Sequence, residues 1–177
     1  RTTGAQTGII STLDTDPQSL VKKAQAAPGL VGRDLVSEVT CQAPYQFHQG
    51  LWSLTDGYPE IDPATAHFQV VAFDFGIKRN ILRNLTMRGC NVTVVPADTS
   101  AAEVLKLNPD GVFLNNGPGD PEPLHYAQET IRELLGKVPI FGICLGLGYA
   151  VVARYDPQHV KALSDSVDYG ALVEHPV

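Results

Sequence analysis

The chain has 177 residues, of which 44% are hydrophobic and 18% are charged, and its formal net charge at pH 7 is −6. This composition is typical of one globular domain, or of one domain with an appended piece. The negative charge argues against a protein that binds nucleic acid or a membrane surface, and no apolar run is long enough to span a bilayer. The three cysteines, Cys41, Cys90 and Cys144, lie far apart without metal-ligand spacing. They predict a cytoplasmic protein without disulfides or a bound metal.

Residues 1–66 lack strong periodicity, and their part that is rich in proline and glycine, from about residue 40, is interpreted mainly as a linker. The chain begins without an initiator methionine, which suggests an internal cut. We expect a short strand at 8–11, a helix at 16–27 that is capped by Asp16, and another short strand at 52–54.

Strands and helices alternate regularly over residues 67–153. Strands are expected at 68–75, 92–95, 111–115 and 138–143, and helices at 78–88, 100–107 and 124–135. Such an alternation implies βαβ crossovers and a parallel sheet covered on both faces. The predicted fold class is therefore α/β, with a doubly wound and mostly parallel sheet.

A cysteine lies in the sequence Gly-Ile-Cys-Leu-Gly at 142–146, directly after the last predicted strand. A strand that turns sharply into a helix lifts a side chain out of the sheet and points helix-start N–H groups at it. Because the helix N-terminus stabilises a thiolate, Cys144 is a candidate nucleophile. The alternative is a buried structural cysteine, and the spacing alone favours neither interpretation.

A second chemical signal is the sequence Asn-Gly-Pro-Gly-Asp-Pro at 116–121, which follows another predicted strand. Glycines that alternate with prolines build a rigid loop whose N–H groups can bind an anion or a developing oxyanion. By itself this pattern is more typical of a tight turn. Ligands bind beyond the carboxyl ends of parallel strands, so this loop and Cys144 together favour an acyl-transfer site. Asp74, also at a strand end, is expected to have a structural role and to cap neighbouring N–H groups.

The elbow at 142–146 and the loop at 116–121 resemble class I, triad-type glutamine amidotransferases. Within that family, the Asp-Phe-Gly-Ile-Lys-Arg-Asn block at 74–80 is similar to the small, glutaminase subunits of carbamoyl phosphate synthetases. The stretches at 28–32 and 49–52 fit the same subunits, and the resemblance extends to about residue 146. It implies an incomplete class I amidotransferase-like α/β domain at 67–153. The remainder of a smaller small-subunit N-terminal domain and a linker precede it at 1–66, and a tail that diverges from the family follows it at 154–177. The resemblance also makes the chain look truncated at both ends.

The resemblance implies a mechanism and a partner. Cys144 attacks the side-chain amide of glutamine, the backbone N–H groups of Gly117 and Leu145 form the oxyanion hole, and Gly119 lies beside the bound glutamine. Hydrolysis of the glutamyl thioester gives glutamate, and the ammonia passes to a large synthetase subunit. That subunit is expected to use ATP and Mg²⁺ to make carbamoyl phosphate for arginine and pyrimidine synthesis. No cofactor or metal is expected in this chain.

The chain also departs from the family pattern. The family's catalytic histidine and glutamate lie in a His-Pro-Glu motif far downstream of the cysteine, and this chain ends before such a segment. His175 is followed by Pro and Val and resembles a non-catalytic stretch of the family, while His125 and His159 show no catalytic pattern. Where the family has His-Gln after the elbow, this chain has Leu147 and Gly148.

Three functions therefore stay open. The first is a glutamine-hydrolysing subunit, for which an isolated fragment without the base would be nucleophilic but very slow. The second is a catalytically impaired fragment or a non-catalytic partner that retains the fold but lacks the histidine and glutamate of the triad. The third is a nucleotide- or phosphate-binding α/β module that uses residues 117–119 as an anion cradle. The absence of a Gly-x-x-x-x-Gly-Lys-Ser/Thr motif argues against it.

Overall fold

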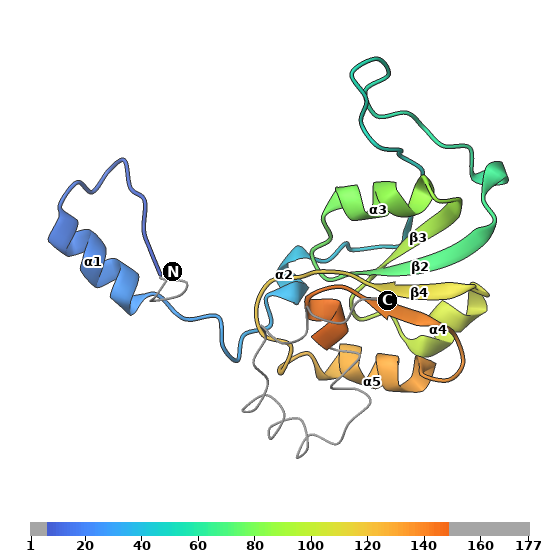
Figure 1. The fold of residues 1–177 in the computed structure, drawn as a ribbon. Coiled ribbons are helices and arrows are strands. Elements are labelled where there is room, and N and C mark those ends of the chain that lie inside the picture. The colour runs from blue at the N-terminus through green and yellow to red at the C-terminus, as the bar shows by residue number, and fades with distance from the viewer. Residues whose placement is uncertain (1–6, 149–177) are drawn as a thin grey trace, which may run out of the picture. The chain divides into compact units, whose positions relative to one another are not determined.

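The computed structural model describes residues 7–148 (Figure 1). The chain divides into two compact units, with the boundary between Val31 and Gly32. The predicted divisions at residues 66 and 153 stay predictions, and the predicted tail at 154–177 lies outside the described residues.

The first unit contains one helix, α1 (Pro17–Ala26), among its described residues. The Asp16 carboxylate accepts hydrogen bonds from the N–H groups of Gln18 and Ser19, and proline occupies the first helical position. The predicted capped helix is therefore confirmed. The strand predicted at 8–11 is wrong, because these residues are irregular and pair with no described strand.

The second unit is built on a five-stranded sheet with the order β1-β3-β2-β4-β5. Its strands are β1 (Tyr45–Phe47), β2 (Phe68–Asp74), β3 (Cys90–Pro96), β4 (Gly111–Leu114) and β5 (Ile140–Gly142). Strands β2 to β5 pair in parallel, whereas β1 is antiparallel to β3. The predicted α/β class and the mostly parallel sheet are confirmed. The edge strand β1 was not expected, because three residues are too few to show an alternating pattern.

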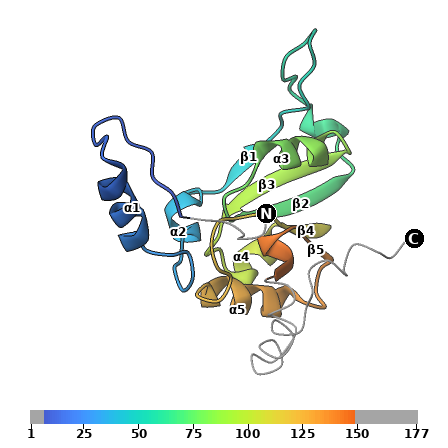
Figure 2. The ribbon, with the colours of Figure 1, turned by 60° about the vertical axis from the view of Figure 1, so that its left-hand side comes forward.

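Helices cover both faces of this sheet, with α3 on one face and α4 and α5 on the other (Figures 1 and 2). The helical segments that both begin and end within the described residues of this unit are α2 (Val36–Val39), η1 (Pro63–Thr65), α3 (Arg79–Thr86), α4 (Ala101–Lys106) and α5 (His125–Leu134), and another begins at Leu145. The start of α4 is a capping box, in which Ser100 and Glu103 each accept a hydrogen bond from the other's backbone N–H. Each helix predicted in this unit is confirmed to within two residues at either end.

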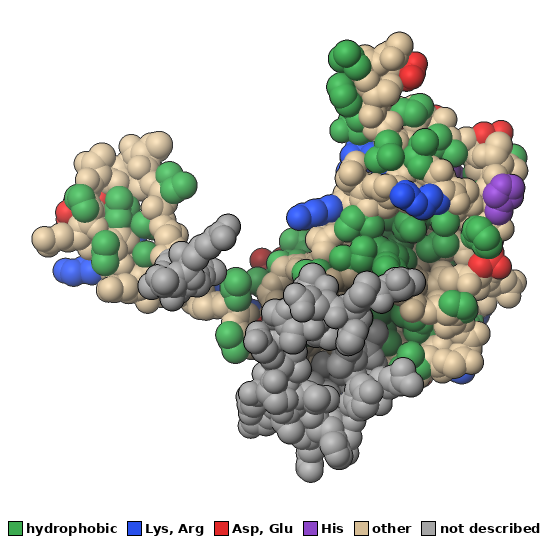
Figure 3. Space-filling view, in the orientation of Figure 1, with side chains coloured by type: hydrophobic (Ala, Val, Ile, Leu, Met, Phe, Trp, Pro, Cys, Tyr) green, Lys and Arg blue, Asp and Glu red, His purple; other side chains and the backbone are tan. Residues whose placement is uncertain are grey.

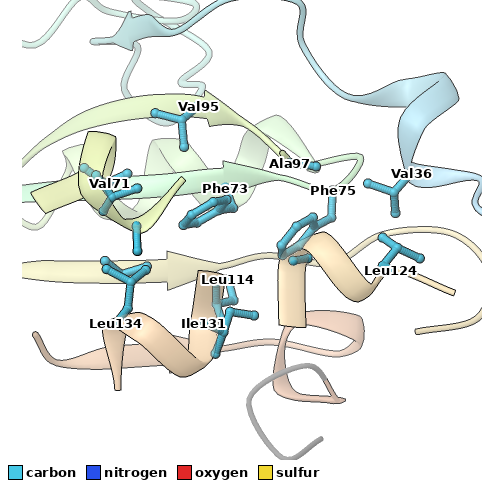
Figure 4. Close-up of a cluster of buried hydrophobic side chains, with 14 of the residues drawn as sticks. Val36, Val71, Phe73, Phe75, Val95, Ala97, Leu114, Leu124, Ile131 and Leu134 are labelled. Carbon is cyan, nitrogen blue, oxygen red and sulfur yellow. The ribbon is translucent and has the colours of Figure 1, made fainter. Parts of the chain in front are cut away.

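The core lies on both faces of the sheet because successive residues of β2 point in opposite directions. Val71 and Phe73 belong to the cluster under α4 and α5, where Figure 4 shows them facing Leu114, Ile131 and Leu134. Ala72 belongs to the other cluster, with Phe47 and Leu82 among its members. Because side chains pack on both faces of the sheet, each strand is held in place between the two layers of helices, and the loops at the strand ends are positioned with it.

Residues 49–61 form a hairpin that projects away from the sheet (Figure 1). Only isolated bridges, Gln49 with Glu60 and Ser53 with Gly57, connect its two arms, so the strand predicted at 52–54 is wrong. Hydrophobic side chains lie on this projection (Figure 3), and Trp52 is 57% exposed. In residues 7–148 no helix is both long and apolar enough to cross a membrane.

Candidate active site

Cys144 lies at the turn between β5 and a helical segment that begins at Leu145. Its φ of 56° is in the left-handed region, which non-glycine residues rarely adopt and which is enriched at functional sites. The Cys144 side chain is exposed. The predicted strand–elbow–helix geometry is confirmed, and the alternative of a buried structural cysteine is wrong.

Glycines on both sides of the elbow allow it to lie directly against the end of β4. A Cβ on Gly146 would lie 2.1 Å from the Leu114 carbonyl oxygen, and one on Gly142 would lie 2.7 Å from a backbone nitrogen of the helical segment. The Ile143 N–H donates to the Leu114 carbonyl at 2.9 Å, and the Gly146 N–H donates to the Asn115 carbonyl at 3.1 Å. Residues of any larger size would push the cysteine away from the sheet.

The Gly117 loop lies between the elbow and the loop that follows β2. A Cβ on Gly117 would lie 2.3 Å from the Phe75 carbonyl oxygen and 2.8 Å from Leu145 Cδ2. In the described part of the chain, neither the Gly117 N–H nor the Leu145 N–H donates a hydrogen bond. The structure therefore brings Gly117 against Leu145, the residue that follows Cys144, and no described residue occupies either backbone donor.

Gly119 and Asp120 attach the same loop to residues near the start of the second unit. A Cβ on Gly119 would lie 3.3 Å from Leu35 Cδ1. The Asp120 carboxylate accepts hydrogen bonds from the N–H groups of Gly32 and Glu122, both at 3.0 Å. The role of Gly119 beside a bound glutamine stays a prediction.

The loop after β2 is organised by Asp74. Its carboxylate accepts hydrogen bonds from the N–H groups of Gly76, Ile77 and Cys41, each at 3.0 Å. The expectation that Asp74 is a structural cap is confirmed. Burial and, secondarily, the Asp74 charge raise the pKa of the Cys41 thiol to about 11, and burial also raises the pKa of Cys90. These two half-buried cysteines therefore stay protonated at neutral pH.

Two asparagines at the end of β4 had not been singled out from the sequence. The buried Asn115 side chain donates to the Phe73 carbonyl and accepts from the Phe75 N–H. The Asn116 side chain bonds to the backbone of Gly76 and Lys78. A pair of asparagines directly after a buried strand was the available signal, since asparagine side chains readily bond to nearby backbone.

A general base is not located beside the cysteine within residues 7–148. The histidines of this part, His48, His67 and His125, make no hydrogen bond to the Cys144 thiol. His159 and His175 lie outside the described residues. Among the described residues there is also no group of three or more His, Cys, Asp or Glu side chains that could hold a metal ion.

Comparisons with known proteins agree with this geometry. Residues 71–156 match the family described as glutamine amidotransferase class-I. The chain is 65% identical over 146 residues to the carbamoyl phosphate synthase small chain of Syntrophotalea carbinolica, and 56% identical over 149 residues to that of Vibrio parahaemolyticus. Each match covers 82% of this chain, and the chain spans only 39% of the length of these relatives. The segment 71–156 therefore belongs to the class I glutamine amidotransferases, in a chain that is homologous to carbamoyl phosphate synthase small chains.

Proposed function

We propose that the protein is the glutamine-hydrolysing subunit of a carbamoyl phosphate synthetase, with Cys144 as its nucleophile. One observation carries the proposal: an exposed cysteine on a strained elbow lies beside Gly117 and Leu145, whose N–H groups donate no hydrogen bond among the described residues. The homology to carbamoyl phosphate synthase small chains supports the choice of glutamine as the substrate.

The proposed reaction has two halves. The Cys144 thiolate attacks the side-chain amide carbon of glutamine, so that a C–S bond forms and the carbonyl electron pair moves onto the oxygen. The N–H groups of Gly117 and Leu145 stabilise this oxyanion. Collapse of the intermediate breaks the C–N bond, and the nitrogen takes up a proton and leaves as ammonia. Water then attacks the glutamyl thioester, which releases glutamate and restores the thiol.

Both halves need a proton carrier. It must remove the thiol proton, protonate the leaving nitrogen and later activate the water. The family resemblance implies a histidine held by a glutamate for this role. We therefore expect such a pair to approach Cys144 from the open side of the elbow, because the sheet side is filled by β4.

The proposal assigns the use of ammonia to a large synthetase subunit. The printed name of the relatives, "small chain", supports the existence of such a partner. In this proposal the partner carries ATP and Mg²⁺, this chain needs no cofactor of its own, and the assembly makes carbamoyl phosphate in the cytoplasm for arginine and pyrimidine synthesis.

The test is glutamate release from glutamine by the native gene product together with its large partner. We expect Cys144→Ser to lower kcat by about 10³-fold or more, because removal of a nucleophile leaves only residual catalysis. The matched control is Cys90→Ser, a half-buried thiol at the start of β3, which should keep the native rate. Absence of glutamate release from the native assembly would overturn the proposal and favour a non-catalytic partner.

A further inference from the structure

The Asn116 side chain bridges two loops at the carboxyl ends of the parallel strands. Its Oδ1 accepts a hydrogen bond from the Lys78 N–H at 3.2 Å, and its Nδ2 donates to the Gly76 carbonyl at 3.1 Å. A side-chain amide carries a donor and an acceptor in one plane, so it can grip a backbone segment at two points. Asn116 thereby fastens the loop after β4 to residues 76–78.

These two hydrogen bonds of Asn116 lie beyond the last paired residues of β2 and β4. Pairing between β2 and β4 ends at Phe73 with Leu114, so the residues beyond it need other contacts to fix their separation. Gly117 follows Asn116 directly and lies against the Phe75 carbonyl, where even a Cβ would be 2.3 Å from the oxygen. Displacement of Asn116 would therefore displace the Gly117 peptide.

The backbone at residues 76–78, to which Asn116 binds, is itself fixed by hydrogen bonds. Asp74, at the end of β2, accepts hydrogen bonds from the N–H groups of Gly76 and Ile77. A continuous series of contacts thus connects β2 to the Gly117 peptide: the Asp74 carboxylate, the 76–78 backbone and the Asn116 amide. On the other side, the Asn115 carbonyl accepts from the Gly146 N–H, which connects the same loop to the elbow.

We propose that Asn116 is a positioning residue for the oxyanion hole. Its two hydrogen bonds, to the backbone of Gly76 and of Lys78, hold the Gly117 N–H in position beside Cys144. The inference rests on the proposed function, and it adds a residue that acts through another group and does not touch the substrate. Asn116 is only half-buried, unlike the fully buried Asn115, so it can be replaced without opening a cavity in the core.

The first experiment measures steady-state glutamine hydrolysis by the native protein with its large partner. Removal of one oxyanion-hole donor lowers kcat by about 10²- to 10³-fold. A donor that is displaced but still present keeps part of this contribution to the rate. We therefore expect Asn116→Ala to lower kcat by about 10- to 100-fold while KM stays within about twofold. The matched control is Asn84→Ala, which should leave both constants unchanged. The Asn84 amide donates to the Asn80 carbonyl and accepts from the Arg88 guanidinium, two local contacts on and just after α3.

A second readout separates positioning from a general loss of structure. A glutamine-like chloroketone reacts through a tetrahedral oxyanion, which forms when the thiolate adds to the ketone carbon. The sulfur then displaces chloride from the neighbouring carbon, the first C–S bond breaks as the carbonyl re-forms, and a thioether remains. Iodoacetamide instead reacts by direct displacement of iodide, without an oxyanion. We expect Asn116→Ala to slow labelling of Cys144 by the chloroketone about tenfold or more relative to labelling by iodoacetamide.

The possible outcomes are distinct. If the native protein hydrolyses glutamine and Asn116→Ala keeps the native kcat, or slows both reagents equally, the positioning role is wrong and the proposed function stands. If the native protein neither hydrolyses glutamine nor favours the chloroketone, both proposals are wrong. Should Asn116→Ala fail to fold, Asn116→Asp tests the same point, because it keeps the acceptor for Lys78 and loses the donor for Gly76. The ratio of the two reagents then corrects for its added charge.

Discussion

The two ends of the parallel strands use glycine for different reasons. At the carboxyl ends, Gly117 and Gly146 allow close approach, because a Cβ at either position would lie within 2.3 Å of a backbone oxygen. At the amino ends, the hairpin of residues 49–61 contains Gly57, where a Cβ would have no atom within 4 Å and only the φ of 64° favours glycine. Crowding against the backbone therefore marks the candidate active site, whereas backbone conformation alone favours glycine at Gly57; Gly50, at the base of the hairpin, would meet only side chains, at 3.1 Å.

This difference also separates how the two regions are held. The carboxyl-end loops are fastened to one another by side chains such as Asp74 and Asn116. Among the described residues, the hairpin is fastened to α3, where the Arg83 guanidinium donates to Gln49 Oε1 at 2.6 Å and lies 3.8 Å from the centre of the Tyr58 ring. The loops at the carboxyl ends must hold backbone N–H donors in place, so they need contacts along their whole length. The hairpin holds no such donors and does not need these contacts.

The largest effect is expected for Gly146→Ala. The added methyl group would overlap the backbone of Leu114 and Asn115, so the elbow must move, and we expect the free energy of unfolding to fall by about 3 kcal/mol. Urea denaturation followed by circular dichroism measures the change. The control is Gly148→Ala in the same helical segment, where the nearest atom of a described residue, Pro121 Cγ, is 4.0 Å away. Equal stabilities for the two variants would contradict the crowding argument.

A smaller effect concerns the three cysteines. At pH 8 we expect iodoacetamide to label the exposed Cys144 about tenfold or more faster than Cys41 or Cys90, which are half-buried and have a raised pKa. A thiol with a pKa of about 11 is only about 1% thiolate at pH 9, so labelling of Cys41 should increase as the pH rises from 9 towards 11. Peptide mass spectrometry after timed labelling measures each rate. Rapid labelling of Cys41 at pH 8 would show that the loop around Asp74 is open.

The smallest effect is expected for Gly57→Ala at the hairpin. The new side chain meets no atom, so its cost is the left-handed backbone alone, about 1 kcal/mol in the free energy of unfolding. Glutamine hydrolysis by the native assembly should not change. A loss of hydrolysis at this position would mean that the hairpin is coupled to the site, and the contrast between the two ends of the sheet would then fail.

The local sequence was sufficient for the elements that carry a local pattern. Ser100 and Glu103 indicate a helix start at the predicted helix 100–107, because a capping box joins residues three apart, and the structure contains this capping box. The glycines at 142 and 146 around Cys144 likewise predict a sharp turn after a strand, and the structure contains this elbow. Both features depend on contacts between near neighbours, which a single sequence displays.

The contacts that assemble the candidate site depended on the tertiary structure. Strand β1 has three residues, and it exists only because β3 offers a pairing edge. The Asn116 bonds join residues that are 38 and 40 positions apart in the chain, so the asparagine pair after β4 could indicate side-chain bonds to backbone but not which backbone groups accept or donate them. The amino-acid sequence by itself thus determined the candidate residues for the nucleophile and the oxyanion hole, which lie in the Cys144 elbow and the Gly117 loop. Only the packing of β2, β4 and β5 side by side decided that Gly117, Leu145 and Cys144 lie together, because parallel strands bring distant loops to the same edge of a sheet.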